Sequence, residues 1–327
     1  RAMLSACAAS SNRSVVATSY YGVTHPSLTN YLALFSGDFQ GIWDDCKAGA
    51  AVFCAPEEFV PGSGDGTAAA SLTDAQIASA SATPHLFSGR NLVDQLEAHG
   101  RSWKAYMEDL PSAGAQDEYA PVIGGTTVKL YAQKHDPFMY FSDINYAGSA
   151  RLARIVPAAG NLDADLASRH VPDLVWISPN QCHDMHGVSP SSAALIGLPL
   201  CGYPDSGLDH GAIQLGDAYL RDTVGKITSS WTWRHTRSSL AIVWDEDDYT
   251  GFEGTGSSPV GKDGVVLGGG HTLAMVVSSD GDRGRTVATP ANHYSMLAGI
   301  ERIWHLGCLA NACSVPRGAD LGSMFAG

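Results

Sequence analysis

Positive charge is scarce in this sequence, and long apolar runs are missing. The 327 residues include 20 Lys and Arg against 33 Asp and Glu, which gives a net charge of −13. This balance disfavours binding to a polyanion, so we expect no nucleic-acid partner. The longest apolar stretches, such as 240–244 and 273–277, fall well short of the roughly 20 residues that a membrane-spanning helix needs. We therefore expect no transmembrane anchor in this chain.

Charged residues of both signs make up only 16% of the chain, whereas hydrophobic residues make up 44%. This composition is typical of a globular protein, and the length suits one large α/β domain or two smaller ones. No internal repeat and no shift of composition marks a boundary, so we expect a single domain over residues 1–327. Three stretches rich in Gly, Ser, Ala and Pro are expected to be surface insertions, at 61–84, 187–211 and 249–270.

No Cys-x-x-Cys pair occurs among the seven cysteines, which argues against a metal site built from them. Six of them instead stand in close pairs separated by loop-forming residues: Cys46 with Cys54, Cys182 with Cys201, and Cys308 with Cys313. We predict that these pairs are disulfides of a secreted or otherwise extracytoplasmic protein. Buried free thiols or a zinc site are the alternatives.

Short apolar runs with β-branched residues recur along the chain and predict buried strands. They lie at 14–17, 103–106, 174–177, 240–244 and 273–277. Apolar residues at helical spacing separate them, around 28–35, 92–100, 220–227 and 292–305. This alternation predicts an α/β fold with a mostly parallel sheet that helices cover on both faces.

A turn rich in hydroxyl groups follows the first predicted strand. Thr24 and Ser27 lie between this strand and a helix that Ser27 could cap, with Pro26 near the helix start. Free N–H groups and the positive end of the helix would stabilise an alkoxide nucleophile or an incoming phosphate. An ordinary helix cap is the simpler alternative.

Two further polar clusters follow predicted strands. Residues 180–186 come after the strand at 174–177, and there Asp184 and His186 could chelate a zinc-like ion. Four consecutive carboxylates at 245–248 follow the strand at 240–244, and a divalent cation would offset their mutual repulsion. Solvated loops are the alternative for both clusters.

Two histidines are additional candidates. His293 opens the last predicted helix and would reach the same edge of the sheet, unless it is a capping or core histidine. His135 could contact phosphate or a leaving group, or be an ordinary hydrogen-bonded loop residue. If the sheet is parallel, the polar clusters converge, and together they predict a di-metal hydrolase site.

Seven segments of the chain match one known pattern in the same order. They are THPSLTNYLAL at 24–34, NLVDQL at 91–96, WKAYME at 103–108, KHDPF at 134–138, PDLVWISPN at 172–180, WDEDD at 244–248 and NHYS at 292–295. With these segments the chain resembles the bacterial secreted phosphoesterases that include acid phosphatases and non-haemolytic phospholipases C, within the alkaline phosphatase superfamily. The resemblance implies a three-layer α/β/α sandwich, a phosphate-ester or phospholipid substrate, and divalent metal ions, with zinc first and calcium or another divalent ion as alternatives.

The resemblance also implies roles for single residues. Thr24 would be the catalytic nucleophile and would form a phospho-enzyme. Asp245 and Glu246 would bind a metal ion beside Thr24. A second metal ion would be bound by Asp184, His186 and His293. The implied substrate-binding residues are His135 and Asn180. Asp45 lies near the position of a phosphate-contacting asparagine in relatives, but its residue type differs, so no role is assigned to it.

The chain departs from the family pattern at its start. Relatives carry an adjacent Glu and Asn on a strand upstream of the nucleophile, whereas here no acidic residue precedes Asp38. The chain begins at Arg1 without a recognisable secretion signal, and Cys7 has no neighbouring cysteine left to pair with. We therefore expect a missing first strand upstream of residue 1, with a degenerate site as the alternative.

Taken together, the motifs predict a secreted metal-dependent phosphoesterase of the acid phosphatase or phospholipase C type. The alternative is a catalytically degenerate secreted binding protein on the same fold. A sulfatase-type esterase is disfavoured because the sequence lacks the Cys-x-Pro-x-Arg pattern that supplies its oxidised nucleophile.

Overall fold

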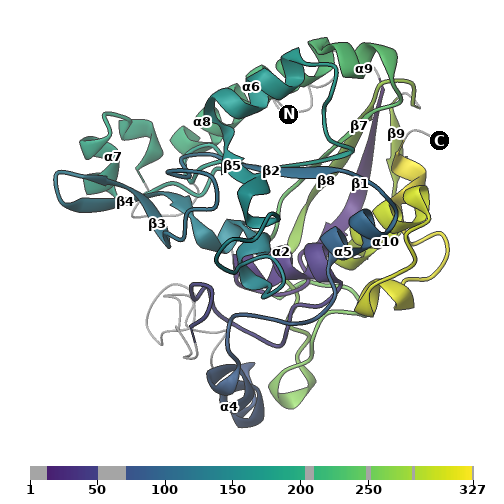
Figure 1. The fold of residues 1–327 in the computed structure, drawn as a ribbon. Coiled ribbons are helices and arrows are strands. Elements are labelled where there is room, and N and C mark those ends of the chain that lie inside the picture. Colours follow the sequence, from purple (N-terminus) through teal and green to yellow (C-terminus); the bar gives the residue numbers. More distant parts are fainter. Residues whose placement is uncertain (1–12, 51–70, 203–209, 248–251, 282–283, 326–327) are drawn as a thin grey trace. The chain divides into compact units, whose positions relative to one another are not determined.

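The computed structural model describes residues 13–50, 71–202, 210–247, 252–281 and 284–325 (Figure 1). The chain divides into two compact units. The described residues of unit 1 come from 101–139 and 143–238, and those of unit 2 from 13–100, 140–142 and 239–327. Unit 2 therefore combines the first and last described segments of the chain, and unit 1 most of the segment between them. The single domain over 1–327 stays a prediction.

Unit 1 holds a three-stranded parallel sheet in the order β5–β2–β6, formed by Ile155–Pro157, Trp103–Met107 and Leu174–Ser178. The central strand β2 is almost continuously buried, as is typical of the strands of a parallel sheet. An antiparallel hairpin joins β3 (Tyr119–Ile123) to β4 (Thr126–Ala132). The helical elements are α6 (Ala158–Ala167), α7 (Pro190–Leu195), α8 (His210–Ser229), α9 (Trp231–His235), η2 (Gln133–His135), η4 (Leu152–Arg154), η5 (Pro199–Cys201) and η3 (Pro137–Tyr140), whose last residue belongs to unit 2.

The register of unit 1 brings two loops to one edge of its sheet. Met107 at the end of β2 pairs with Ser178 at the end of β6. The next residue along, Glu108, donates its backbone N–H to the Ser178 carbonyl at 3.0 Å. Because the two strands are parallel, the loops that follow them start side by side.

Unit 2 holds a five-stranded sheet in which β10 (Ala291–Asn292), β1 (Ser14–Tyr21), β8 (His271–Ser278) and β7 (Ser239–Val243) are neighbours in that order. The fifth strand, β9 (Arg285–Val287), also pairs with β1. Its helical elements are α2 (Ser27–Ser36), α4 (Asp74–Ala82), α5 (Leu92–Ala98), α10 (His293–Trp304), η6 (Lys262–Gly264), η7 (Ala310–Ser314) and η8 (Leu321–Met324).

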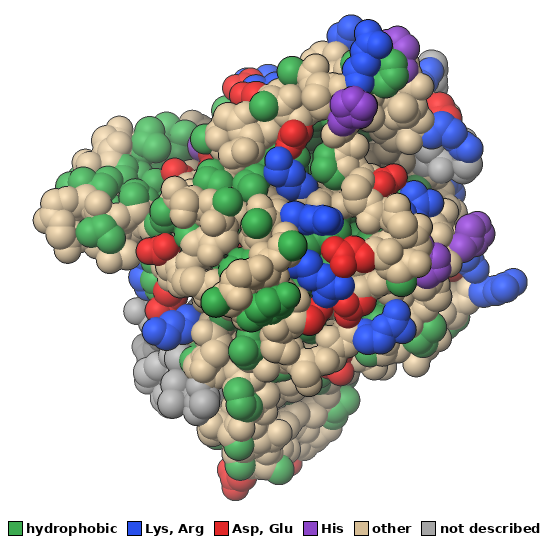
Figure 2. All heavy atoms as spheres, in the orientation of Figure 1, with side chains coloured by type: hydrophobic (Ala, Val, Ile, Leu, Met, Phe, Trp, Pro, Cys, Tyr) green, Lys and Arg blue, Asp and Glu red, His purple; other side chains and the backbone are tan. Residues whose placement is uncertain are grey.

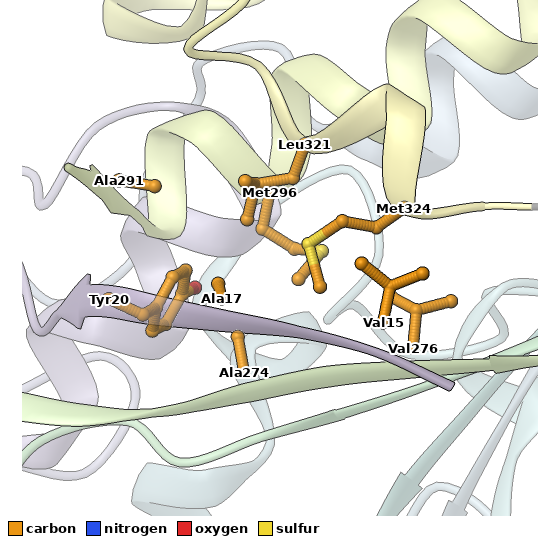
Figure 3. Packing of buried hydrophobic residues seen from close by; sticks show 9 residues of the cluster. All are labelled: Val15, Ala17, Tyr20, Ala274, Val276, Ala291, Met296, Leu321 and Met324. Atoms are coloured by element: carbon orange, nitrogen blue, oxygen red, sulfur yellow. The ribbon is translucent and has the colours of Figure 1, made fainter. Parts of the chain in front are cut away.

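One face of the unit 2 sheet packs against the end of the chain (Figure 3). The sheet contributes small and β-branched side chains from β1 and β8, and α10 and η8 contribute flexible Met and Leu side chains that fill the space between them. The buried cluster consists of Val15, Ala17, Tyr20, Ala274, Val276, Ala291, Met296, Leu321 and Met324. This packing fixes β1, which leads directly into the turn at 22–27.

The α/β class is confirmed, and parallel pairing predominates narrowly among the described strands. Four strand pairings are parallel and three are antiparallel. β8 runs antiparallel to both β1 and β7, so its first residue, His271, pairs with Tyr21 at the end of β1. A parallel return normally needs a crossover helix. The described residues between β7 and β8 form only the short turn η6 and no α-helix, which is consistent with the reversed direction.

Two of the three predicted disulfides are present, Cys182–Cys201 and Cys308–Cys313. Cys46 is also disulfide-bonded. Cys54 and Cys7 lie outside the described residues, so the Cys46–Cys54 pair stays a prediction. Among the helices that the structure describes, none combines the length and the apolar character required to cross a bilayer.

Candidate active site

The turn after β1 is held in place by a buried asparagine of α2. Asn30 accepts the Val23 N–H through Oδ1 at 2.7 Å and donates from Nδ2 to the Thr24 carbonyl at 2.5 Å. Thr24 is itself buried. At the start of α2, Asp45 accepts the Leu28 N–H at 3.0 Å. One amide and one carboxylate therefore set the path of the backbone through the predicted nucleophile turn.

Within this turn, a histidine and a serine both contact one of the predicted metal ligands. Ser27 Oγ donates to Oε1 of Glu246 at 2.8 Å, and His25 Nδ1 lies 2.5 Å from Oε2 of the same carboxylate. The other ring nitrogen, Nε2, lies 3.6 Å from Oδ1 of Asp247. Both His25 and Ser27 are buried. The structure thus brings the turn after β1 together with the acidic loop after β7.

His293 lies beside the same acidic loop, at the start of α10. Its Nε2 lies 2.6 Å from the backbone carbonyl of Asp245, to which it can only donate, so Nδ1 accepts from the Tyr20 hydroxyl at 2.8 Å. Burial lowers the pKa of His293, which favours the neutral ring. A neutral imidazole is the form that binds metals. Here its two nitrogens contact Tyr20 and the Asp245 backbone.

A run of glycines fits between these two loops. Gly22 donates its N–H to the Gly270 carbonyl at 3.0 Å, and Gly269 donates to the Gly22 carbonyl at 3.1 Å. A Cβ on Gly22 would lie 2.8 Å from the Asp245 carbonyl oxygen, and one on Gly270 would lie 2.0 Å from Cγ of Asp247. Only a residue without a side chain leaves room for the acidic loop at this distance.

In unit 1, the loops after β2 and β6 form a second polar cluster. The Asn180 backbone N–H donates to Glu108 Oε2 at 2.9 Å, and its side-chain amide donates to Asp109 Oδ2 at 2.7 Å. His183 Nδ1 lies 2.9 Å from Glu108 Oε1. Burial lowers the pKa of His183, but the hydrogen bond and charge of Glu108, with the charges of Asp109 and Asp184, raise it overall. The predicted substrate residue Asn180 is therefore oriented by two carboxylates.

The remaining predicted residues of unit 1 lie near one another. His135 Nδ1 lies 3.2 Å from Oδ2 of Asp184, and Asp184 Oδ1 accepts the His186 backbone N–H at 2.8 Å. The His186 ring donates from Nδ1 to the Gly187 carbonyl at 3.0 Å, because a carbonyl can only accept. Burial lowers the pKa of His186. The loop 180–186 and η2 thus place three predicted residues together.

Sequence reasoning missed several polar residues of both clusters. Glu108 and Asp109 directly follow β2, and the rule that polar residues after a strand mark a site would have found them. His25 and Asp247 stand inside motifs that were singled out, but no local pattern tells which of four consecutive acids faces the histidine. That choice depends on the path of the loop.

Another group with metal-binding residue types lies outside these motifs. Asp44, Cys46 and His85 are buried and their ligand atoms lie within 4.8 Å of one another. Cys46 is in a disulfide, so it offers no thiolate. Asp44 Oδ1 lies 2.6 Å from His85 Nε2, so these two side chains form a buried pair with each other and not a metal site.

The cluster of unit 2 contains residue types that bind divalent metal ions. Glu246 and Asp247 supply carboxylate oxygens and His25 supplies an imidazole nitrogen, all in one partly buried cluster. Zinc accepts both ligand types, and calcium and magnesium favour the oxygens. A hydroxyl at the start of a helix lies beside these donors.

The chain belongs to the Phosphoesterase family, whose model matches residues 3–196 and 203–307. It is 24% identical over 296 residues to a Kluyveromyces lactis protein named "Probable acid phosphatase". This alignment covers 90% of this chain and 52% of the yeast protein. It is also 24% identical over 302 residues to the phosphatidylinositol-3-phosphatase of Mycobacterium tuberculosis, over 92% of this chain and 70% of that enzyme. The chain thus spans about half the length of the yeast relative.

A search of solved structures finds a protein of the alkaline phosphatase superfamily from Vibrio parahaemolyticus. The similarity has a TM-score of 0.41 at 11% sequence identity and covers 92% of this chain and 59% of the Vibrio chain.

Proposed function

We propose that this protein hydrolyses phosphate esters with the help of a divalent metal ion. The observation that carries the proposal is the contact of Ser27 and His25 with the two oxygens of Glu246, in a chain of the Phosphoesterase family. The names of the relatives, an acid phosphatase and a phosphatidylinositol-3-phosphatase, favour phosphate monoesters, including those on lipid headgroups, as the substrate class.

The metal is proposed to bind at the acidic loop after β7. Asp245 and Glu246 remain the proposed ligands, and Asp247 joins them because its carboxylate faces His25. When bound, a divalent ion would lower the pKa of the attacking hydroxyl and offset the charge of the phosphoryl group. Zinc is proposed first, with calcium as the alternative. Asp184, His186 and His293 stay predicted ligands of a second ion.

The structural contacts favour Ser27 over Thr24 as the nucleophile. Ser27 Oγ already donates to Glu246 Oε1, so a proton acceptor stands beside it, and it occupies the first position of α2, where N–H groups stabilise phosphate oxygens. In the proposed reaction Ser27 Oγ gives its proton to Glu246 and bonds to phosphorus, the bond from phosphorus to the leaving oxygen breaks, and the leaving alkoxide takes up a proton from water. Water then hydrolyses the phosphoserine and releases inorganic phosphate.

Two matched variants test this assignment with p-nitrophenyl phosphate as substrate. Ser27→Ala should lower kcat by at least about a thousandfold and abolish a trapped phospho-enzyme, as expected for a nucleophile. Thr24→Ala should keep the phospho-enzyme. The opposite result would return the role to Thr24. Turnover by the wild-type chain should stop with a chelator and resume with zinc or calcium; no turnover under any metal would leave the non-catalytic binding protein as the better account.

An extracytoplasmic location is proposed as well. Its support is the presence of disulfides, which persist in oxidising compartments.

A further inference from the structure

Three leucines of unit 1 are exposed close together in the sequence. Leu195 ends α7, Leu198 follows it and Leu200 lies in η5, and their exposed fractions are 44%, 40% and 51%. We call Leu195, Leu198 and Leu200 the leucine surface. Figure 2 shows hydrophobic side chains gathered over α7 and the β3–β4 hairpin. Exposed apolar side chains that gather in one place can mark an interaction site.

The segment that carries the leucine surface has no charge. Residues 187–202 contain no Asp, Glu, Lys or Arg, although these residues make up 16% of the chain. Placing a charged side chain in an apolar medium is strongly unfavourable. The segment is therefore matched in charge to the apolar part of a bilayer, whereas most of this acidic protein is not.

Many backbone N–H groups of the segment form hydrogen bonds within the segment. The N–H groups of Val188, Ala193, Leu198, Cys201 and Gly202 all donate to carbonyls within the segment. Ser192 donates to the Ser189 hydroxyl, and the segment contains two prolines that have no N–H. Unsatisfied backbone groups are what keep irregular chain out of lipid. For these groups that cost is met inside the segment.

The inner side of the segment is filled and fixed. Cys182, Val188, Ala193 and Cys201 form a buried cluster, against which Leu130 of β4 and Leu215 of α8 pack. The Cys182–Cys201 disulfide ties the base of the segment to the loop 180–186. With this inner side occupied, the leucine surface has no place in the core of unit 1 and points outward.

We propose that the leucine surface inserts into the interface of a lipid bilayer. Protein partners are usually recognised through Trp, Tyr and Arg, and residues 187–202 contain none of these. Insertion into lipid gains free energy from the apolar area that is buried, which aliphatic side chains supply. Because the chain carries a net charge of −13, attraction to anionic headgroups is not expected. The partner is a neutral phosphatidylcholine surface.

Insertion would also place a predicted substrate-binding loop at the level of the lipid headgroups. Asn180 and Asp184 flank Cys182, whose disulfide partner Cys201 lies next to Leu200. A lipid phosphate would then meet the loop without leaving the bilayer. This consequence rests on the proposed hydrolysis of phosphate esters, whereas the insertion itself does not.

Sedimentation with phosphatidylcholine vesicles tests the proposal on the full chain. The triple variant Leu195→Ser, Leu198→Ser, Leu200→Ser should bind at least about tenfold more weakly than wild type, since each leucine loses its transfer to lipid. The control Val265→Ser, Val266→Ser changes two side chains of unit 2 that are each 41% exposed, and it should bind like wild type. Circular dichroism and turnover of p-nitrophenyl phosphate confirm that both variants fold.

Three results would overturn the proposal. They are equal binding by the triple variant, no binding of wild type to neutral vesicles, and binding only to anionic vesicles in a salt-sensitive manner. A wild-type dimer that the triple variant converts to a monomer, with vesicle binding unchanged, would assign the leucines to contact between copies. Vesicle binding without any turnover would leave the insertion standing and remove the proposed function instead.

Discussion

At the scale of single residues, buried ionisable groups decide how stability depends on pH. Glu301 of α10 is buried and accepts a hydrogen bond from Gln95 Nε2 at 2.9 Å. Burial raises the pKa of Glu301 to about 7, because the charged form loses its hydration. The folded chain therefore holds this proton at pH values where the unfolded chain has released it.

The sign of the effect follows from proton binding. Between the ordinary pKa of 4.5 and about 7, the folded state binds more protons, so the free energy of unfolding should fall as the pH rises. The slope is expected to be on the order of 1 kcal/mol per pH unit. Glu301→Gln should flatten it, as measured by urea unfolding at several pH values from 4 to 8. An unchanged slope in this variant would assign the pH dependence to other groups.

The buried pair of Asp44 and His85 was not predicted by any sequence motif. Both side chains are fully buried, and Asp44 Oδ1 also accepts the Cys46 N–H at 3.0 Å. Burial lowers the pKa of His85, but the hydrogen bond and charge of Asp44, with the Ala50 carbonyl, raise it overall. This pair holds the loop whose next residue, Asp45, contacts the first turn of α2.

Removing one member of this pair should leave the other charge buried alone. His85→Ala is expected to lower the free energy of unfolding by about 3–5 kcal/mol in denaturant titrations. The double variant Asp44→Asn, His85→Ala should lose clearly less than the two single variants added together, because the charges depend on each other. Simple additivity would show that the pair is not coupled.

At the scale of elements, the contact between the turn after β1 and the loop after β7 depends on the glycines before β8. Gly270 has a φ of +75° and no room for a Cβ beside Asp247, whereas Gly264 has a φ of +79° and nothing within 4 Å. The two positions share a positive φ but differ in the space around them. They therefore separate the effect of crowding from the effect of conformation.

Gly270→Ala should displace the Asp247 carboxylate and reduce phosphate-ester turnover by at least about tenfold, as expected when a site residue moves by about 1 Å. Gly264→Ala should keep turnover and lose only about 1 kcal/mol of stability from the positive φ. Kinetics and thermal unfolding of both variants provide the measurement. Equal turnover in the two variants would contradict the crowding argument.

At the scale of the whole molecule, the disulfides close loops of very different length. Cys182 and Cys201 are 19 residues apart, and Cys308 and Cys313 only 5. A crosslink restricts the unfolded chain more when its loop is longer. Replacing both members of each pair by Ser should therefore lower the free energy of unfolding by about 3 kcal/mol for Cys182–Cys201 and by about 2 kcal/mol for Cys308–Cys313.

Denaturant titration of the two double variants under oxidising conditions tests whether loss of Cys182–Cys201 is the more destabilising. A larger loss for Cys308–Cys313 would point to native-state packing around that bridge.

The sequence alone was enough to predict the α/β class, the five main strands, two disulfides and the family. These features depend on periodicity, spacing and motif order, which neighbouring residues carry. Only the tertiary structure decided that β8 runs antiparallel, that Ser27 contacts Glu246, and that Asp44 pairs with His85. Ser27 and Glu246 are 219 residues apart, so their contact depends on how the strands pack and on glycines that leave space. No local pattern contains that information, because it arises from the packing of distant segments.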